Sequence, residues 1–244
     1  AIVTGGSRGL GAEIAEGLAE AGAAVFLLAR RDRWLGPAVE AMKSRGFRCE
    51  GALCDVSEKD QVEDAVGQAI EAFGAVDILV NNAGITWGAE PEKMPLDRWR
   101  AVLDVNLTGA FLCAQTVGRA MIQRRAGNII NVASIAGLRG TGRLGNSIAG
   151  YAASKAGLLG MTRELASRWG RLGIRVNALA PGYFPTRMTE TIFEQVEQAY
   201  RETAPLGRAG RPGELKGAAV FLASDASSYV TGQTIIVDGG ATIV

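Results

Sequence analysis

Short apolar runs alternate with helix-like segments along the whole sequence. The runs cover residues 1–3, 25–29, 49–53, 78–80, 128–132, 175–180 and 234–237, and a segment with helical spacing of apolar residues separates most consecutive pairs. Strands connected through helices pair in parallel and are covered on both faces. At 244 residues without a linker-like stretch, the chain is predicted to be one α/β domain over residues 1–244. It is expected to be a doubly wound parallel sheet of about seven strands with helices on both faces.

A glycine-rich turn follows the first run: Thr4-Gly5-Gly6-Ser7-Arg8-Gly9-Leu10-Gly11. Glycines permit a tight turn and let a pyrophosphate approach the backbone at the N-terminus of the next helix. The spacing is G-x-x-x-G-x-G, whereas the commoner fingerprint is G-x-G-x-x-G. A plain glycine loop is the alternative. The position between a strand and a helix favours a dinucleotide-binding Rossmann domain, with a first strand that lacks its opening residues.

The residues after the second run bear on which dinucleotide binds. NAD-binding domains usually carry an acidic residue there, about 20 residues after the glycines, to bond the ribose 2′-hydroxyl. Here Ala29 is followed by Arg30 and Arg31, and Arg8 lies in the glycine turn. Guanidinium groups match phosphate geometry, so NADP(H) is predicted, with NAD(H) as a second option. The alternative is solvated arginines, one of them paired with Asp32.

Polar residues also follow other predicted strands. Asp55 follows the third, Asn82-Ala83-Gly84 the fourth and Ser134 the fifth, and the carboxyl ends of parallel strands border the ligand crevice. Asp55 beside Ser57 also fits a helix cap, and the asparagines also fit a tight turn. Residues 106–109 (Asn-Leu-Thr-Gly) interrupt the helix-like segment 96–122, which indicates either an asparagine that orders water or a kink.

Tyr151 and Lys155 open a helix-like segment that runs to Trp169. Residues four apart lie on one face of a helix, and a nearby cation lowers the pKa of a phenol. The spacing therefore predicts a tyrosine that exchanges protons at a carbonyl or alcohol oxygen near neutral pH. The alternative for an isolated pair of this kind is two surface side chains without a catalytic role.

Composition narrows the chemistry. The chain has no histidine, which excludes Ser-His-Asp and Cys-His catalysis and argues against a zinc site. A net charge of +1 gives no sign of the basic surface that nucleic-acid-binding proteins carry. Cys49, Cys54 and Cys113 lack metal-ligand spacing and are expected in the core of a protein from a reducing compartment. No uninterrupted apolar run reaches the roughly 18 residues of a membrane span, and no leader pattern is present. A cytoplasmic enzyme is expected.

Taken in order, these residues resemble the short-chain dehydrogenase/reductase family over essentially the whole chain. The matching motifs are Thr4-Gly5-x3-Gly9-x-Gly11, Asn81-Asn82-Ala83-Gly84, Asn106, Ser134, Tyr151-x3-Lys155 and Pro181-Gly182. The resemblance implies that Tyr151 is the catalytic acid/base and that Ser134 holds the carbonyl oxygen. It implies that Lys155 binds the nicotinamide ribose, lowers the tyrosine pKa and relays protons with a water held by Asn106.

The resemblance also implies the remaining cofactor contacts and an assembly. Asp55 and Val56 would flank the adenine, Asn82 the adjoining ribose region, and Thr186 the nicotinamide amide. A homotetramer, or a homodimer, would pack through the helices near residues 96–122 and 151–169. The full expected cofactor-binding set is Gly5, Ser7, Arg8, Gly9, Leu10, Gly11, Arg30, Arg31, Asp55, Val56, Asn82, Ala83, Gly84, Tyr151, Lys155, Pro181, Gly182 and Thr186.

Two branches of the family are similar in local sequence around residues 84–89 and 180–189: NADPH-dependent 3-oxoacyl reductases and proteins of the gluconate 5-dehydrogenase type. The expected reaction is hydride transfer between NADP(H) and a ketone or secondary alcohol, with an NAD(P)-dependent sugar-acid or polyol dehydrogenase as the alternative. Ser134 and Tyr151 lie 17 positions apart (151 − 134), a longer interval than the family usually has. Residues 190–203 are expected to form a substrate lid.

The residues present disfavour two further functions. A non-catalytic NADPH-binding regulator would tolerate loss of Tyr151 or Lys155, and both are present. The enoyl reductase branch resembles Tyr-x6-Lys, whereas this chain has Tyr-x3-Lys.

Overall fold

The computed structural model describes residues 1–140, 146–186 and 193–244, without the Phe193 side chain. In these ranges seven strands form one sheet in the order β3-β2-β1-β4-β5-β6-β7, and every pairing is parallel. The strands are β1 (Ile2–Thr4), β2 (Val25–Ala29), β3 (Cys49–Leu53), β4 (Ile78–Asn81), β5 (Gly127–Val132), β6 (Ile174–Pro181) and β7 (Thr234–Val237). The strand order reverses direction between β1 and β4, and in such sheets a ligand crevice opens at this point.

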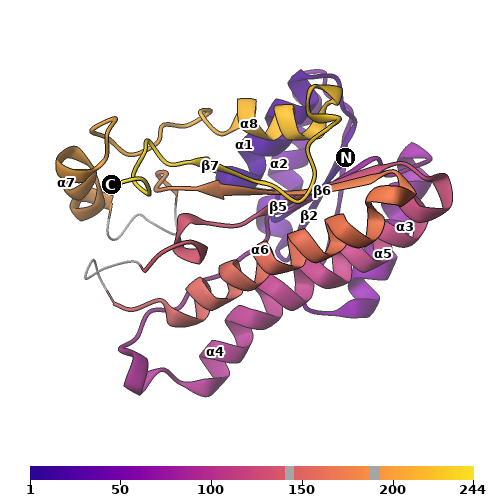
Figure 1. Ribbon diagram of the computed structural model, residues 1–244. Coiled ribbons are helices and arrows are strands. Elements are labelled where there is room, and N and C mark those ends of the chain that lie inside the picture. The colour runs from indigo at the N-terminus through magenta and orange to yellow at the C-terminus, as the bar shows by residue number, and fades with distance from the viewer. Residues whose placement is uncertain (141–145, 187–192) are drawn as a thin grey trace.

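Helices cover both faces of the sheet, and Figure 1 shows α1, α2 and α8 on one side and α3, α5 and α6 on the other. Their bounds are α1 (Gly9–Glu20), α2 (Asp32–Ser44), α3 (Lys59–Phe73), α4 (Leu96–Leu103), α5 (Gly109–Arg124), α6 (Ala149–Trp169), α7 (Phe193–Thr203) and α8 (Lys216–Ala223). The predicted doubly wound parallel sheet is confirmed.

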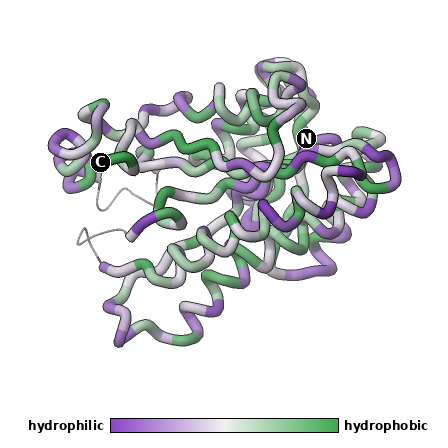
Figure 2. The backbone as a smooth tube through the Cα atoms, in the orientation of Figure 1, coloured by the Kyte–Doolittle hydropathy of each residue, from purple (hydrophilic) through white to green (hydrophobic). Residues whose placement is uncertain are grey.

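The alternation of side chains along the strands divides the core into two layers. Ile2 packs with α3, α5 and α6, while its neighbour Val3 packs with α1, α2 and α8. Successive residues of a strand point to opposite faces, so a strand covered on both faces is apolar at every position. All five residues of β2 are buried for this reason. Figure 2 shows hydrophobic stretches in the centre of the molecule and along the helices that cover it.

Several predicted boundaries agree closely with the observed elements. β2, β3 and β7 have the predicted bounds, and α6 begins two residues before Tyr151. The C-terminal helix starts at Lys216, later than the predicted residue 213. Within the predicted lid, residues 190–192 lie outside the described residues, and α7 forms the rest.

The interruption in the segment 96–122 is a single π-helical turn, η2 (Asp104–Thr108), between α4 and α5. Such turns are rare and frequently mark functional sites. By length and composition, Leu96–Arg124 would be long and apolar enough to cross a membrane. Cys113, Val117 and Met121 from this segment are buried against the sheet, which is the setting of a core helix.

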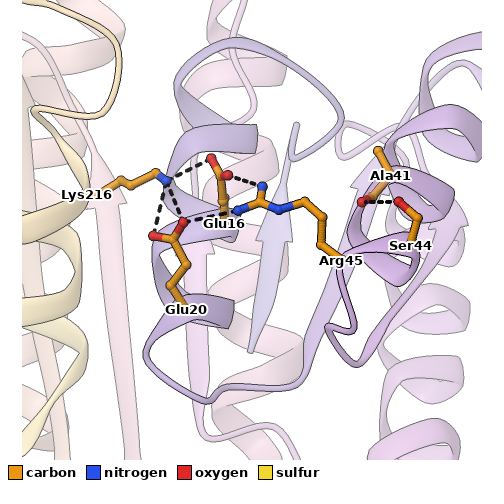
Figure 3. Close-up of polar contacts among 6 residues, drawn as sticks. All are labelled: Glu16, Glu20, Ala41, Ser44, Arg45 and Lys216. Atoms are coloured by element: carbon orange, nitrogen blue, oxygen red, sulfur yellow. Dashed lines mark hydrogen bonds and ion pairs between the residues drawn. The ribbon is translucent and has the colours of Figure 1, made fainter.

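An ion-pair cluster joins α1 to α8 and to the end of α2 (Figure 3). Lys216 lies 2.8 Å from Glu16 and 3.0 Å from Glu20, and Arg45 pairs with the same two carboxylates. The hydrogen bonds from Lys216 and Arg45 hold the pKa of Glu16 below its ordinary value. The cluster fixes α1, whose other end carries the glycine turn.

Candidate active site

A cavity of about 670 Å³ opens at the carboxyl ends of the strands. Its wall is built from the residues that directly follow β1 to β5 and from the end of β6. The predicted site residues in this wall are Gly5, Ser7, Arg8, Gly9, Leu10, Gly11, Arg30, Arg31, Asp55, Val56, Asn82, Ala83, Gly84, Ser134, Tyr151, Lys155, Pro181, Gly182 and Thr186. Asn106 is buried behind it.

The glycine turn has a backbone that side chains would disrupt. Gly5 and Gly9 have φ angles of 63° and 56°, in the left-handed region that favours glycine. A Cβ at Gly11 would collide with the Gly5 carbonyl oxygen and the Asn82 amide, whereas one at Gly9 would lie 3.8 Å from Thr186. The turn is therefore closed toward the sheet at Gly11 and faces the cavity at Gly9, beside the N-terminus of α1. This arrangement fits an anion such as a pyrophosphate.

Thr4 fastens the glycine turn to the turn after β4. Its hydroxyl oxygen accepts hydrogen bonds of 2.9 Å from the backbone N–H groups of Asn82 and Ala83. The Asn82 side chain in return donates to the Thr4 carbonyl oxygen at 2.9 Å. The Asn82 side chain thus positions the backbone, and the sequence motif gave Thr4 no role of its own.

At the other end of the cavity, Arg30 meets the carboxylate that follows β3. Arg30 Nη1 lies 3.4 Å from Asp55 Oδ2, so Arg30 pairs with Asp55 across two strands. Burial alone would raise the pKa of Asp55, but hydrogen bonds from Ser57 and the charge of Arg30 bring it below its ordinary value. The Ser57 N–H and hydroxyl donate to Asp55 Oδ1 at 3.1 and 2.7 Å. These bonds close a turn before α3, whose N-cap is Glu58 without a side-chain cap bond, so the helix-cap alternative is wrong.

Tyr151, Ser134 and Lys155 meet at the inner end of the cavity. Ser134 Oγ accepts a 3.1 Å hydrogen bond from the Ala136 N–H, and its hydroxyl is close enough to Tyr151 to lower the pKa of that phenol. Lys155 Nζ lies 5.6 Å from the centroid of the tyrosine ring. Lys155 is 3% exposed and donates a 2.7 Å hydrogen bond to the Val132 carbonyl oxygen. Burial lowers the pKa of Lys155 to about 8.

The expectation of a lowered tyrosine pKa is wrong for this structure. Burial raises the pKa of Tyr151, the neighbouring Ser134 hydroxyl offsets part of the rise, and nearby Tyr183 adds to it. The physical reason is that desolvation disfavours the phenolate, while the ammonium of Lys155 is bonded to Val132.

Asn106 occupies the π turn and uses its side chain to bind the chain beside the cavity. Its Oδ1 accepts from the Ile85 N–H at 2.8 Å, and its Nδ2 donates to the Ile85 carbonyl and to Ser154 Oγ, both at 3.0 Å. Ser154 Oγ donates to the Tyr151 carbonyl at 2.7 Å. Asn106 is therefore linked to the helix that carries Tyr151 and Lys155, and its side chain anchors protein groups.

The chain is similar in sequence to curated proteins over nearly its whole length. The family model described as Enoyl-(Acyl carrier protein) reductase matches residues 5–242. The chain is 42% identical over 241 residues to the 3-oxoacyl-[acyl-carrier-protein] reductase FabG of Chlamydia trachomatis, covering 98% of this chain and 96% of that protein. It is 41% identical over 245 residues to the gluconate 5-dehydrogenase of Gluconobacter oxydans, covering 100% and 94%.

A solved structure agrees in fold and sequence. The gluconate 5-dehydrogenase of Burkholderia cenocepacia J2315, in complex with NADP and tartrate, superimposes with a TM-score of 0.94 and 40% identity, covering 100% of this chain and 94% of that one. The chain belongs to the short-chain dehydrogenase/reductase family.

Tertiary structure adds residues to the site of this short-chain dehydrogenase/reductase that sequence reasoning missed. Trp34, Ile85, Thr86 and Phe184 also line the cavity. All four carried a weak signal, since each lies within three residues of a predicted contact. Among the described residues, no group of three or more metal-ligating side chains is present.

Proposed function

We propose that this protein is an NADP(H)-dependent oxidoreductase that interconverts a ketone and a secondary alcohol, with a 3-oxoacyl-type substrate as the first candidate. The observation that carries the proposal is the pair of neighbouring hydroxyls, Tyr151 and Ser134, beside the buried Lys155 in the cavity that begins at the glycine turn. An acid/base group next to a second hydroxyl suits an oxygen that gains or loses a proton.

The cavity wall fits a phosphorylated dinucleotide. The pyrophosphate would bind at the glycine turn, including Ser7 and Leu10, and at the N-terminus of α1. Gly9 has no side chain and faces the cavity, so a phosphate can approach the backbone there. Arg8, Arg30 and Arg31 would meet the 2′-phosphate, and Asp55 and Val56 would flank the adenine. When bound, NADP(H) supplies or accepts the hydride. Asn82, Ala83 and Gly84 would lie along the ribose, and Pro181, Gly182 and Thr186 beside the nicotinamide.

The residues at the inner end exchange the proton. Tyr151 would donate its hydroxyl proton to the carbonyl oxygen during reduction and recover it during oxidation, while the Ser134 hydroxyl orients that oxygen. Lys155, with a pKa of about 8, is tuned to pass a proton near neutral pH. Asn106 positions this machinery: a Cβ at Gly84 would lie 3.3 Å from Asn106 Oδ1 and 3.7 Å from Lys155 Nζ, so the three residues converge.

The alternative substrate class is a sugar acid or polyol, as in gluconate 5-dehydrogenase. It is favoured by the structural likeness to the Burkholderia enzyme, while the identities of 42% and 41% to the two curated relatives do not separate the classes. An enoyl reductase is disfavoured because the tyrosine and lysine are spaced Tyr-x3-Lys, unlike the enoyl branch.

The deciding experiment follows oxidation of NADPH and NADH by the purified protein with three kinds of carbonyl compound: a β-keto thioester, 5-keto-gluconate and a simple aryl ketone. We expect NADPH oxidation to be fastest with the thioester. A faster rate with 5-keto-gluconate would establish the sugar-acid alternative. Tight NADPH binding without turnover of any substrate would favour a regulator, and no binding of either dinucleotide would overturn the proposal.

A cytoplasmic homotetramer belongs to the same proposal. Three buried free cysteines, Cys49, Cys54 and Cys113, suit a reducing compartment. Leu96 and Phe111 on the 96–122 segment are 59% and 42% exposed, which suits a face covered by another copy. Light scattering of the purified protein would test the assembly, and a monomer would overturn this part.

A further inference from the structure

Trp34 is the aromatic residue of the cavity wall at its arginine-rich end. Its ring lies beside two guanidinium groups: the Cζ atoms of Arg8 and Arg33 are 5.2 and 5.3 Å from the ring centroid. The side chain is 36% exposed and lines the cavity together with Arg8, whereas Arg33 does not contribute to the wall. A guanidinium at this distance from an indole face is attracted to it.

The Trp34 ring is carried by a helix, whereas Arg8 lies in the turn before one. Trp34 lies in the first turn of α2, and its backbone N–H donates to the Arg31 carbonyl oxygen at 3.1 Å. Arg8 precedes α1 with an extended backbone, and an arginine side chain has large rotamer freedom to lose on binding. An aromatic surface that holds the guanidinium removes part of this freedom before any ligand arrives, and such preorganisation favours binding.

The two arginines that approach the cavity from different strands thus have different partners. Arg30 is paired with Asp55 at 3.4 Å, and Arg8 lies over Trp34. We propose that Trp34 is a positioning residue that holds the Arg8 guanidinium where it meets the 2′-phosphate of NADP(H), so that this indole contributes to the preference for the phosphorylated dinucleotide. The inference rests on the proposed use of NADP(H).

The test measures dissociation constants of the intact protein for NADPH, NADH and adenosine 2′,5′-bisphosphate, by calorimetry so that the readout is independent of turnover. Trp34→Leu is expected to weaken NADPH and the bisphosphate about threefold to tenfold, as for a partly desolvated cation–π contact, and NADH by less than about twofold. Trp34→Phe keeps an aromatic face and is expected to restore most of the affinity.

Arg33→Ala is the matched control, because it removes a guanidinium from the same ring but from outside the cavity wall. Its effect on NADPH is expected to stay under about twofold. Arg8→Ala leaves the indole in place and should lower the NADPH preference at least as much as Trp34→Leu. In the double variant of Arg8→Ala and Trp34→Leu, the Trp34 substitution should lower the NADPH affinity little further than Arg8→Ala alone. The effects of two residues that act through one another do not add.

Three results would overturn the inference: equal weakening of NADPH and NADH by Trp34→Leu, which would make the ring an adenine contact; additive effects in the double variant; or an unchanged preference in both Trp34 variants. Each leaves the proposed function standing as long as the unmodified protein binds NADPH. A protein that binds neither dinucleotide would overturn both.

Discussion

Lys155 Nζ lies 5.6 Å from the centroid of the Tyr151 ring and donates a 2.7 Å hydrogen bond to the Val132 carbonyl oxygen at the end of β5. The cation is thus held by the sheet, one helical turn from the phenol that it was expected to activate. A buried ammonium with one carbonyl partner is costly, and burial lowers its pKa to about 8. The pair therefore combines a hard-to-ionise phenol with an amine that titrates close to neutral pH.

Tyr151→Phe is predicted to lower the rate of carbonyl reduction by at least about 100-fold, the usual contribution of a positioned acid/base group. NADPH binding should change by less than about twofold, because the phenol hydroxyl lies at the inner end of the cavity near Ser134. Stopped-flow turnover and calorimetry measure the two quantities. A phenylalanine variant with most of its rate would mean that another group moves the proton.

Lys155→Met is predicted to stabilise the ligand-free protein while abolishing turnover. The pKa of Lys155 is about 8 in the folded protein, whereas its ordinary value is 10.5. At any pH below about 8 the folded protein therefore holds a buried positive charge, which costs stability. The variant should gain on the order of 1 kcal/mol at pH 7, after loss of the bond to Val132 is subtracted. Thermal denaturation at several pH values measures this gain.

The pH dependence of that gain has a definite sign. Between about pH 8 and 10.5 the unfolded chain keeps the lysine proton that the folded chain has lost, so the stability contributed by this group rises with pH. The advantage of Lys155→Met over the unmodified protein should therefore be full below pH 8 and shrink toward pH 10.5. An advantage that grows with pH in this window would contradict the burial of a charged lysine.

Arg30→Ala is predicted to weaken NADPH binding by about tenfold or more, the value of a charge-assisted contact to a phosphate, and NADH binding far less. The variant also removes the ion-pair partner of Asp55. Burial raises the pKa of Asp55, and Ser57 and Arg30 together bring it below its ordinary value. Asp55→Asn is the control, because it leaves Arg30 in place without its ion pair. Equal loss of both dinucleotides in Arg30→Ala would move the 2′-phosphate site elsewhere.

Lys216→Met is predicted to lower the melting temperature by about 2 °C at low ionic strength, and by less in 1 M salt. The methionine keeps the stem that packs on Gly17 in α1 but loses the ion pairs with Glu16 and Glu20. Lys59→Met is the matched control: its 3.8 Å pair with Glu63 lies within the exposed face of α3, and no change is expected. Equal changes in melting temperature for the two variants would show that the ion pairs between α1 and α8 stabilise the fold no more than an exposed pair does.

The sequence by itself determined the fold and most of the cavity wall. Short apolar runs and period-3.6 patterns are local, so β2, β3 and β7 were predicted with their observed bounds. The residues after the strands of a parallel sheet meet at one edge whatever their distance in the chain, which is why Arg30, Asp55 and Ser134 were predicted to share a crevice and line one cavity.

Tertiary structure alone decided how those groups are charged and held. The pKa of Tyr151 is raised by burial from several elements, and no local spacing encodes that total desolvation. The Asn106 side chain binds Ile85, Lys155 binds Val132 and Arg8 meets Trp34. Each contact joins residues that are more than 20 positions apart, so packing, and not the motif, selects the partner.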